Sequence, residues 1–320
     1  LKALSILTDQ TENKRLAGVL DEVRTDVERG SSLSEAVAKH ERVFPPMMIH
    51  LIRAGELGGF LDKALDSVAG TFEADVKLRA TIKSALTYPV IVLIMAIVAT
   101  IAMLVFIVPV FQNMFASLGG TLPPPTLILI AVSHNMIWIL PLLVVLAIVF
   151  VFWWRRNGHT DRVRAVVDPM RLRLPVFGLL MKKVAVARFT RNFATMIGAG
   201  VPILQSLDIV GQTSGNWVIE QALHRVQDSV RAGRSIAEPL AKEPVFPSMV
   251  TQMIAVGEDA GSMETMLNKI ADFYDDEVQA TTEALTSLIE PIMIAVIGIV
   301  IGGMIVALYM PMFTIYSQIH

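Results

Sequence analysis

The sequence predicts an all-α protein in which two repeated helical bundles are joined to three transmembrane helices. Three observations support this fold class. Residues 44–111 align without a gap with residues 246–313 and share 16 identities in 68 positions. In the charged parts of the chain, apolar side chains recur at three- and four-residue spacings, which is typical of helices with one buried face. Long stretches without any charged residue separate these parts, as expected of membrane spans.

The composition is that of an integral membrane protein, with 53% hydrophobic and 18% charged residues. No Asp, Glu, Lys or Arg occurs in the 71 residues from Ser84 to Trp154, or after Glu290. Residues 1–83 carry 12 basic and 13 acidic side chains, and residues 155–290 carry 15 and 16. Two nearly neutral blocks argue against a nucleic-acid surface. The sequence has no cysteine, which excludes disulfides and thiolate metal sites.

The two charged blocks are the expected bundles, over residues 1–87 and 155–288. Residues 1–7 resemble residues 204–210, which in the second copy follow Gly200-Val201-Pro202 and a helix-like stretch. Proline is favoured in the first turn of a helix, so Pro202 marks a helix start. Because the first copy has no counterpart of the stretch that precedes residue 204, we expect it to begin part-way through its unit.

The three spans are expected at residues 88–111, 126–154 and 289–313. The segment from Pro89 to Pro109 has 21 residues, or roughly 30 Å of helix, which matches the hydrocarbon thickness of a bilayer. An uncharged outer loop is expected over residues 112–125, and an outer tail over residues 314–320. Residues 155–191 carry ten Lys and Arg against two Asp. The positive-inside rule then places both bundles in the cytoplasm of a multi-pass protein of the cytoplasmic membrane.

The repeated soluble motif has three positions in each copy. These are Gly55, Glu56 and Gly59, and Gly257, Glu258 and Gly261. The first glycine of each set suits a left-handed helix end, and the second permits a tight turn into the next helix. Two interpretations of the glutamates remain open. Either they cap that next helix, or they lie on a surface that faces a partner or a second subunit.

A second repeated motif is acidic, Phe72–Val76 in the first copy and Tyr274–Val278 in the second. The pattern favours a helix with one buried edge and a solvated acidic surface. A structural divalent cation is the alternative, although it would need several converging oxygen ligands.

The spans contain prolines and small residues at repeated places. Pro89 and Pro291 lie where each bundle is expected to enter the membrane, as a simple kink or as a hinge. Gly298 and Gly302 form a small-residue face at which another helix could pack. Apart from Glu290 at the edge of the third span and two tyrosines, His134 is the only ionisable residue within the expected spans, and we expect it to be hydrogen-bonded or near the membrane interface.

No sequence motif of catalysis appears. The chain has no GxxxxGK[ST] loop and no HExxH or GxSxG motif, so we expect no catalytic, cofactor-binding or metal site. A membrane enzyme is therefore disfavoured. A transporter or ion-conducting subunit is the alternative function, but it would need more polar side chains at mid-membrane than His134, Asn135 and a few hydroxyls.

The ordered set of motifs resembles a known family, the polytopic inner-membrane platform proteins of type II secretion and type IV pilus systems (the F-domain family). The resemblance covers essentially the whole chain. The matching residues are Phe44-Pro45, Ala54–Gly59, Tyr88-Pro89, Val108–Phe111, Met114-Phe115, Leu122-Pro123, Thr126, Arg188-Phe189, Gly200–Pro202, Phe246-Pro247, Gly257-Glu258, Gly261 and Pro291. Asp259-Ala260 replaces Leu57-Gly58 in the second copy, so the two acidic turns can differ in role.

The resemblance implies a non-enzymatic role with two cytoplasmic six-helix F-domain bundles. It implies a homo-oligomer, with a dimer favoured, that lies above a hexameric assembly ATPase and transmits its movement to pilin or pseudopilin subunits. Other inner-membrane assembly proteins and membrane lipid are further implied partners. It leaves open whether the product is a pilus, a secretion pseudopilus or a competence fibre.

Overall fold

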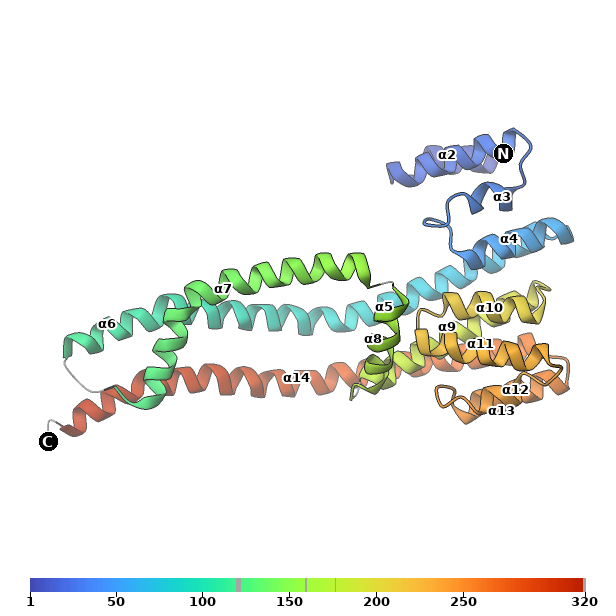
Figure 1. Ribbon diagram of the computed structural model, residues 1–320. Coiled ribbons are helices and arrows are strands. Elements are labelled where there is room, and N and C mark those ends of the chain that lie inside the picture. The colour runs from blue at the N-terminus through green and yellow to red at the C-terminus, as the bar shows by residue number, and fades with distance from the viewer. Residues whose placement is uncertain (119–121, 159, 176, 319–320) are drawn as a thin grey trace. The chain divides into compact units, whose positions relative to one another are not determined.

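The computed structural model describes residues 1–118, 122–158, 160–175 and 177–318, and within these ranges it contains helices and connecting turns but no strand (Figure 1). The elements are α1 (Lys2–Gln10), α2 (Lys14–Glu28), α3 (Leu33–Ala38), α4 (Pro46–Gly58), α5 (Leu61–Ala102), the π-helical turn η1 (Met103–Ile107), α6 (Val108–Leu118), α7 (Pro124–Asn157), α8 (Asp161–Arg173), α9 (Phe177–Gly198), α10 (Ile203–Thr213), α11 (Trp217–Arg231), α12 (Ala237–Ala241), α13 (Ser248–Asp259) and α14 (Met263–Gln318). The all-α prediction is confirmed.

The internal duplication is visible in the helices themselves. Helices α1 to α5 recur in the same order as α10 to α14, with starts that differ by about 202 residues. Pro46 opens α4 and Ser248 opens α13, while Leu61 opens α5 and Met263 opens α14. The gapless alignment of the two copies therefore reflects one helical unit that occurs twice.

Two compact units make up the fold. One consists of Leu1–Ala80 with Arg164–Ala280, and the other of Thr81–Val163 with Thr281–His320. The first unit thus contains most of both expected bundles, while residues 81–87, 155–163 and 281–288 belong to the second unit. Its main core contains Phe189 and Phe193 of α9, and Met47, Leu51 and Val68 of the first copy belong to the same buried cluster. Burial of shared apolar surface is what makes the two copies one unit here.

A smaller core lies within the first copy. Ser32 caps α3 through a capping box with Glu35, and Asn13 caps α2. These caps fix where the two helices begin. Their apolar faces then meet α4 in a second buried cluster that includes Val23, Val37 and Ile52.

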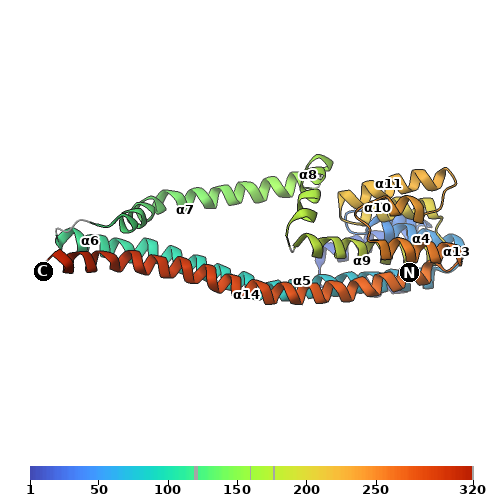
Figure 2. The same ribbon diagram turned by 90° about the horizontal axis from the view of Figure 1, so that it is seen from below.

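The second unit holds the apolar parts of the three helices that are long and apolar enough to span a membrane (Figure 2). They are found within Leu61–Phe115, Pro124–Asn157 and Met263–Phe313.

The helices are longer than the expected spans at two places. Residues 112–118 of the expected outer loop are helical, and so are residues 314–318 of the expected outer tail. No helix breaker occurs in the sequence between Gln112 and Gly119-Gly120, which explains the longer helix. Residues 119–121 and 319–320 lie outside the described residues.

Pro89 and Pro291 lie inside continuous helices. Pro89 is an internal residue of α5, and Pro291 is an internal residue of α14. A proline within a helix removes one backbone hydrogen bond and locally weakens the helix without ending it. Both positions therefore remain candidates for a hinge.

The glycines of the repeated motif divide into two roles. Gly59 closes α4 with φ 72°, and Gly261 follows α13 with φ 63°, so these two form the tight turns that the sequence predicts. Gly55 and Gly257 are helical instead, which corrects the expectation of a left-handed helix end. They permit close approach of the next helix. A Cβ at Gly55 would lie 2.7 Å from Ala64 Cβ and 3.0 Å from Leu61 Cα.

This close approach gives a prediction for Gly55→Ala. The added methyl group meets backbone of α5, so we expect the free energy of unfolding to fall by about 1–3 kcal/mol. The control is Gly70→Ala on α5, where a Cβ meets nothing within 4 Å. That change should be neutral or stabilise by up to about 1 kcal/mol. Thermal unfolding of the purified chain in detergent checks both, and equal effects would show that the α4–α5 contact is not tight.

Candidate functional site on helix α9 and the repeated glutamates

Helix α9 combines an apolar buried face with basic residues along its edge. Val184, Val186, Phe189 and Phe193 are buried, which fixes the helix in the core of its unit. The charged side chains Lys183, Arg188 and Arg191 are 18–26% exposed, so their charged ends lie at the edge of that core. Partly buried cations need acidic partners, because burial without one is costly.

These basic residues bind the acidic motif of both copies. Arg188 Nε lies 2.8 Å from Asp75 Oδ1 of α5. On α14, Lys183 Nζ lies 2.6 Å from Glu277 Oε2, and Arg191 Nη2 lies 2.7 Å from Asp275 Oδ2 and 2.8 Å from Asp272 Oδ1. Asp75 and Glu277 occupy equivalent positions, 202 residues apart. One helix therefore pairs with the same position of each copy.

The prediction of a solvated acidic surface is wrong for these carboxylates. Asp75, Asp275 and Glu277 are 25–39% exposed and are held by ion pairs. Burial lowers the pKa of Arg191, but its hydrogen bonds to Asp272 and Asp275 outweigh burial and raise the pKa above its usual value. Burial, together with the charge of Glu277, raises the pKa of the adjacent Tyr274 phenol. Asp75, Asp275 and Glu277 thus make helix–helix contacts, whereas Glu73 and Asp276 of the same motif are exposed, as the sequence predicts.

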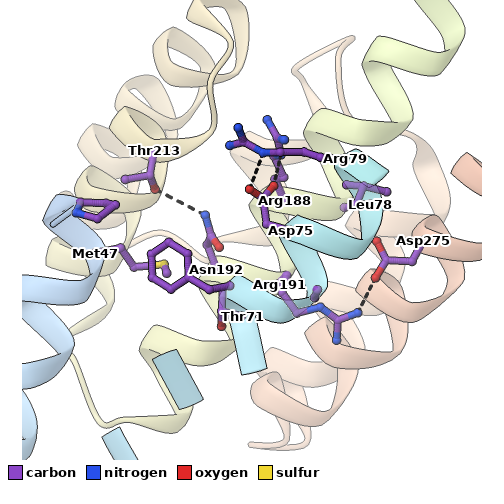
Figure 3. Close-up of a pocket in the computed structure, with 14 residues that line it drawn as sticks. Met47, Thr71, Asp75, Leu78, Arg79, Arg188, Arg191, Asn192, Thr213 and Asp275 are labelled. Carbon is purple, nitrogen blue, oxygen red and sulfur yellow. Dashed lines mark hydrogen bonds and ion pairs between the residues drawn. The ribbon is translucent and has the colours of Figure 1, made fainter. Parts of the chain in front are cut away.

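The contact between Arg188 and Asp75 is electrostatic rather than a well-aligned hydrogen bond. Arg188 Nε and Asp75 Oδ1 are buried, and neither makes a hydrogen bond of normal angle with any described residue. Figure 3 shows Asp75 between Arg79 and Arg188, and Arg191 directed toward Asp275. Arg79 Nε donates to Asp75 Oδ2 at 2.7 Å from the same helix. Asp75 therefore joins one exposed arginine of its own helix to one partly buried arginine of α9.

A pocket of about 260 Å³ lies where these side chains meet. Met47, Phe72 and Leu78 supply its apolar surface, and the pocket also includes Asn192 and Thr213, which share a hydrogen bond of 3.5 Å (Figure 3). Its volume is below the ~300–1,000 Å³ of usual small-molecule sites. We interpret it as the space around the α5–α9 contact. Beside it, Thr71 and Thr195 join α5 to α9 through hydroxyls 2.9 Å apart.

The repeated glutamates bind backbone at the start of an earlier helix. Glu56 accepts hydrogen bonds from Leu33 N at 2.5 Å and Ser34 N at 3.1 Å, at the N-terminus of α3. Glu258 accepts from Ile236 N at 2.9 and 3.0 Å and from Ala237 N at 3.3 Å, at the N-terminus of α12. Both copies use the same arrangement.

The expectation that these glutamates cap the following helix is therefore wrong. The physical reason is that α3 packs against α4, and α12 against α13, so the end of the later helix returns to the start of the earlier one. The carboxylate then satisfies N–H groups that have no partner within the helix and lies at the positive end of the helix dipole. Each bond spans 21 to 23 residues of sequence.

The glycine face of α14 has no close neighbour among the described residues. A Cβ at Gly298 or Gly302 would meet nothing within 4 Å among the described residues. His134 is exposed on α7, and its neighbour Asn135 donates to its own helix at Ala131 O. No group of three or more His, Asp or Glu that could hold a metal ion occurs in the part of the chain that the structure describes.

Comparison with known proteins identifies the family. The family described as Type II secretion system (T2SS), protein F matches residues 1–109 and 189–311, which include most of both copies. The chain belongs to this family. Type IV pilus assembly protein PilC of Myxococcus xanthus is 43% identical over 322 residues, covering 100% of this chain and 77% of that protein. PilC of Thermus thermophilus is 43% identical, covering 100% and 79%. Type II secretion system protein F of Xanthomonas campestris is 32% identical, covering 99% and 78%.

Sequence reasoning on this protein F homologue missed Lys183 and Arg191 as members of a site. A signal was present, since these are cations within an otherwise apolar helix. Their partners could not be found from sequence, because contacts such as that between Asp75 and Arg188 join residues 113 positions apart. Only packing of α5, α9 and α14 brings the charges together.

The two arginines that share Asp75 give a matched test. Arg188→Gln removes a partly buried cation and leaves the carboxylate less well paired, so the free energy of unfolding should fall by about 1–3 kcal/mol. Arg79→Gln removes an exposed i,i+4 pair and should cost less than about 0.5 kcal/mol. Thermal unfolding in detergent at low and high salt measures both. Equal losses in the two variants would contradict the importance of the α9 contact.

Proposed function

We propose that this chain is the inner-membrane platform protein of a type IV pilus or type II secretion machine, and that it transmits movement from a cytoplasmic assembly ATPase to pilin or pseudopilin subunits. The supporting observation is the pairing of α9 with both copies in a protein F family member. Its relatives are named as pilus assembly and type II secretion proteins. In this role the chain acts as a scaffold that transmits movement and catalyses no reaction.

The orientation follows from charge. The ten Lys and Arg of residues 155–191 favour the cytoplasmic side, so the unit formed by Leu1–Ala80 and Arg164–Ala280 faces the cytoplasm. The three apolar helices then cross the inner membrane. In this proposed orientation, the unit formed by Leu1–Ala80 and Arg164–Ala280 is within reach of a soluble ATPase, and the spans are within reach of membrane-embedded subunits.

The ion pairs provide a route for movement. Arg188 holds α5 through Asp75, while Lys183 and Arg191 hold α14. Both α5 and α14 run without interruption into apolar segments. A displacement of α9 would therefore move two membrane helices together. Pro89 and Pro291 lie in those helices, where a missing backbone hydrogen bond permits bending.

The turns that follow α4 and α13 are the proposed partner surfaces. Leu57 is 84% exposed at the end of α4, and Asp259 is exposed at the end of α13. Glu56 and Glu258 hold these turns against α3 and α12, so they present the surface rather than form most of it. The unused glycine face of Gly298 and Gly302 is the proposed contact for a second copy, most simply in a dimer, or for a pilin helix.

The first test is binding of the whole chain in nanodiscs to its assembly ATPase. The whole chain is needed because both copies share one core. We expect Glu258→Gln to weaken binding about tenfold, or by about 1.4 kcal/mol, because the turn after α13 loosens. Binding is measured by surface plasmon resonance.

Two further variants show which turn and which charge contribute to binding. Asp259→Asn keeps the cap of α12 but removes the exposed charge, and Glu56→Gln makes the equivalent change in the first copy. A loss only with Glu56→Gln would move the contact to the first copy. Normal binding by all three variants would remove both turns from the interface.

The hinge proposal is tested with Pro291→Ala. The alanine restores the missing N–H and stiffens α14, so membrane insertion should stay normal while fibre assembly or secretion falls. Membrane fractionation and counts of surface fibres measure the two effects. Pro89→Ala is the equivalent change in the first copy, and normal fibre assembly with both variants would exclude a hinge at these positions.

A further inference from the structure

The apolar helices of the two copies each contain a second proline at an equivalent place, Pro109 and Pro311. Proline has no backbone N–H, so a carbonyl in the preceding turn loses its usual donor. In an apolar environment a carbonyl without a hydrogen bond is costly, and no water replaces the missing donor. Each copy therefore has to satisfy a backbone oxygen from elsewhere.

In α14 the affected oxygen is that of Ala307, four residues before Pro311. Thr126 Oγ1 donates to Ala307 O at 2.5 Å. The Thr126 side chain belongs to α7, and its residue is 1% exposed. A hydroxyl from a different helix thus takes the place of the N–H that proline lacks.

In the first copy the affected oxygen is that of Leu104, within the π-helical turn η1. Val108 N–H bonds to Met103 O, five residues earlier, so it is engaged there. The next residue in that register is Pro109, which has no N–H to offer Leu104 O. Ser133 Oγ donates to Leu104 O at 2.5 Å, and Ser133 is buried.

The two hydroxyls come from one face of one helix. Thr126 and Ser133 are seven residues apart on α7, or about two turns. Figure 1 shows that the first part of α7 crosses from α14 toward α5 and α6. Buried residues of both copies, Leu104, Val108, Met304 and Leu308, meet partly buried residues of α7 around this crossing.

Other hydroxyls near these helices behave differently. Thr87 donates to Lys83 O and Ser117 donates to Met114 O, each within its own helix. Such bonds are common for Ser and Thr in helices and join nothing else. Thr126 and Ser133 instead reach carbonyls 181 and 29 residues away in sequence.

We propose that Thr126 and Ser133 are positioning residues that bind the proline-weakened turns of both copies to α7, so that the ends of α5–α6 and α14 move as one body. This positioning can be measured on the isolated chain and does not depend on the proposed platform function. Its consequence for fibre assembly rests on the proposed platform function.

The test is a double-mutant cycle on the whole chain in detergent. Thr126→Val keeps the shape but removes the donor, and we expect it to lower Tm by roughly 2 °C or more. In a Pro311→Ala background, the new alanine supplies a backbone N–H that can satisfy Ala307 O, so Thr126→Val should then have little further effect. The crossed background Pro109→Ala should give no such rescue. Ser133→Ala should show the reverse dependence, with rescue by Pro109→Ala only.

The conservative variants Thr126→Ser and Ser133→Thr keep a donor and should retain Tm near that of the parent chain. If Thr126→Val lowers Tm equally in all backgrounds, the residue acts by packing and the proposal is overturned. The same holds if Thr126→Val has no effect at all. If Thr126→Val fails to fold, loss of Tm with Thr126→Ser in the parent chain would also overturn it, because that variant retains the hydroxyl.

A second measurement separates the positioning from its function. Leu129→Cys introduces one thiol beside the crossing in a chain that has no cysteine, and its labelling rate reports opening of the contact. Labelling should be faster in Thr126→Val and normal in Thr126→Ser, and equal rates would overturn the proposal. Fibre assembly in cells should be lost in step with faster labelling. Faster labelling with normal assembly would keep the positioning role and overturn its link to the platform function.

Discussion

The packing of α9 against both α5 and α14 is the constraint on which the charged unit depends. Phe189 and Phe193 place α9 in a core that residues of both copies share. This burial supplies the non-directional part of the stability. The ion pairs at its edge then favour the observed register, which brings Arg188 Nε to 2.8 Å from Asp75 Oδ1. Apolar packing holds the helices together, and charge fixes how they lie.

Helices α7 and α9 each contact both copies. Helix α9 does so with charged side chains in the unit formed by Leu1–Ala80 and Arg164–Ala280. Helix α7 does so with hydroxyls in the other unit, where charges would be costly. The chemistry differs between the units because partly exposed side chains can carry charge, whereas apolar segments favour neutral donors.

Each glutamate of the repeated motif holds a turn, and the residue that follows it is exposed. Glu258 uses both carboxylate oxygens on the backbone of α12, so its charge is largely committed to holding a turn. The exposed residue beside it, Asp259, is free of that task and differs between the copies. The two turns therefore keep the same backbone contacts, while the residue that follows each glutamate differs between the copies.

The sequence by itself determined the all-α class, the duplication and the apolar helices, because these depend on local periodicity and on long charge-free segments. It also determined the turns at Gly59 and Gly261, which follow from backbone sterics. Tertiary structure decided where the charges and hydroxyls are used. Asp75 forms its ion pair with Arg188 only once α5 and α9 pack together. In the same way, Glu56 accepts hydrogen bonds at the start of α3, and Ser133 donates to Leu104 O, only in the folded chain. Local patterns carry no information on such partners, since hydrogen bonds and ion pairs act over a few ångströms of space regardless of distance along the chain.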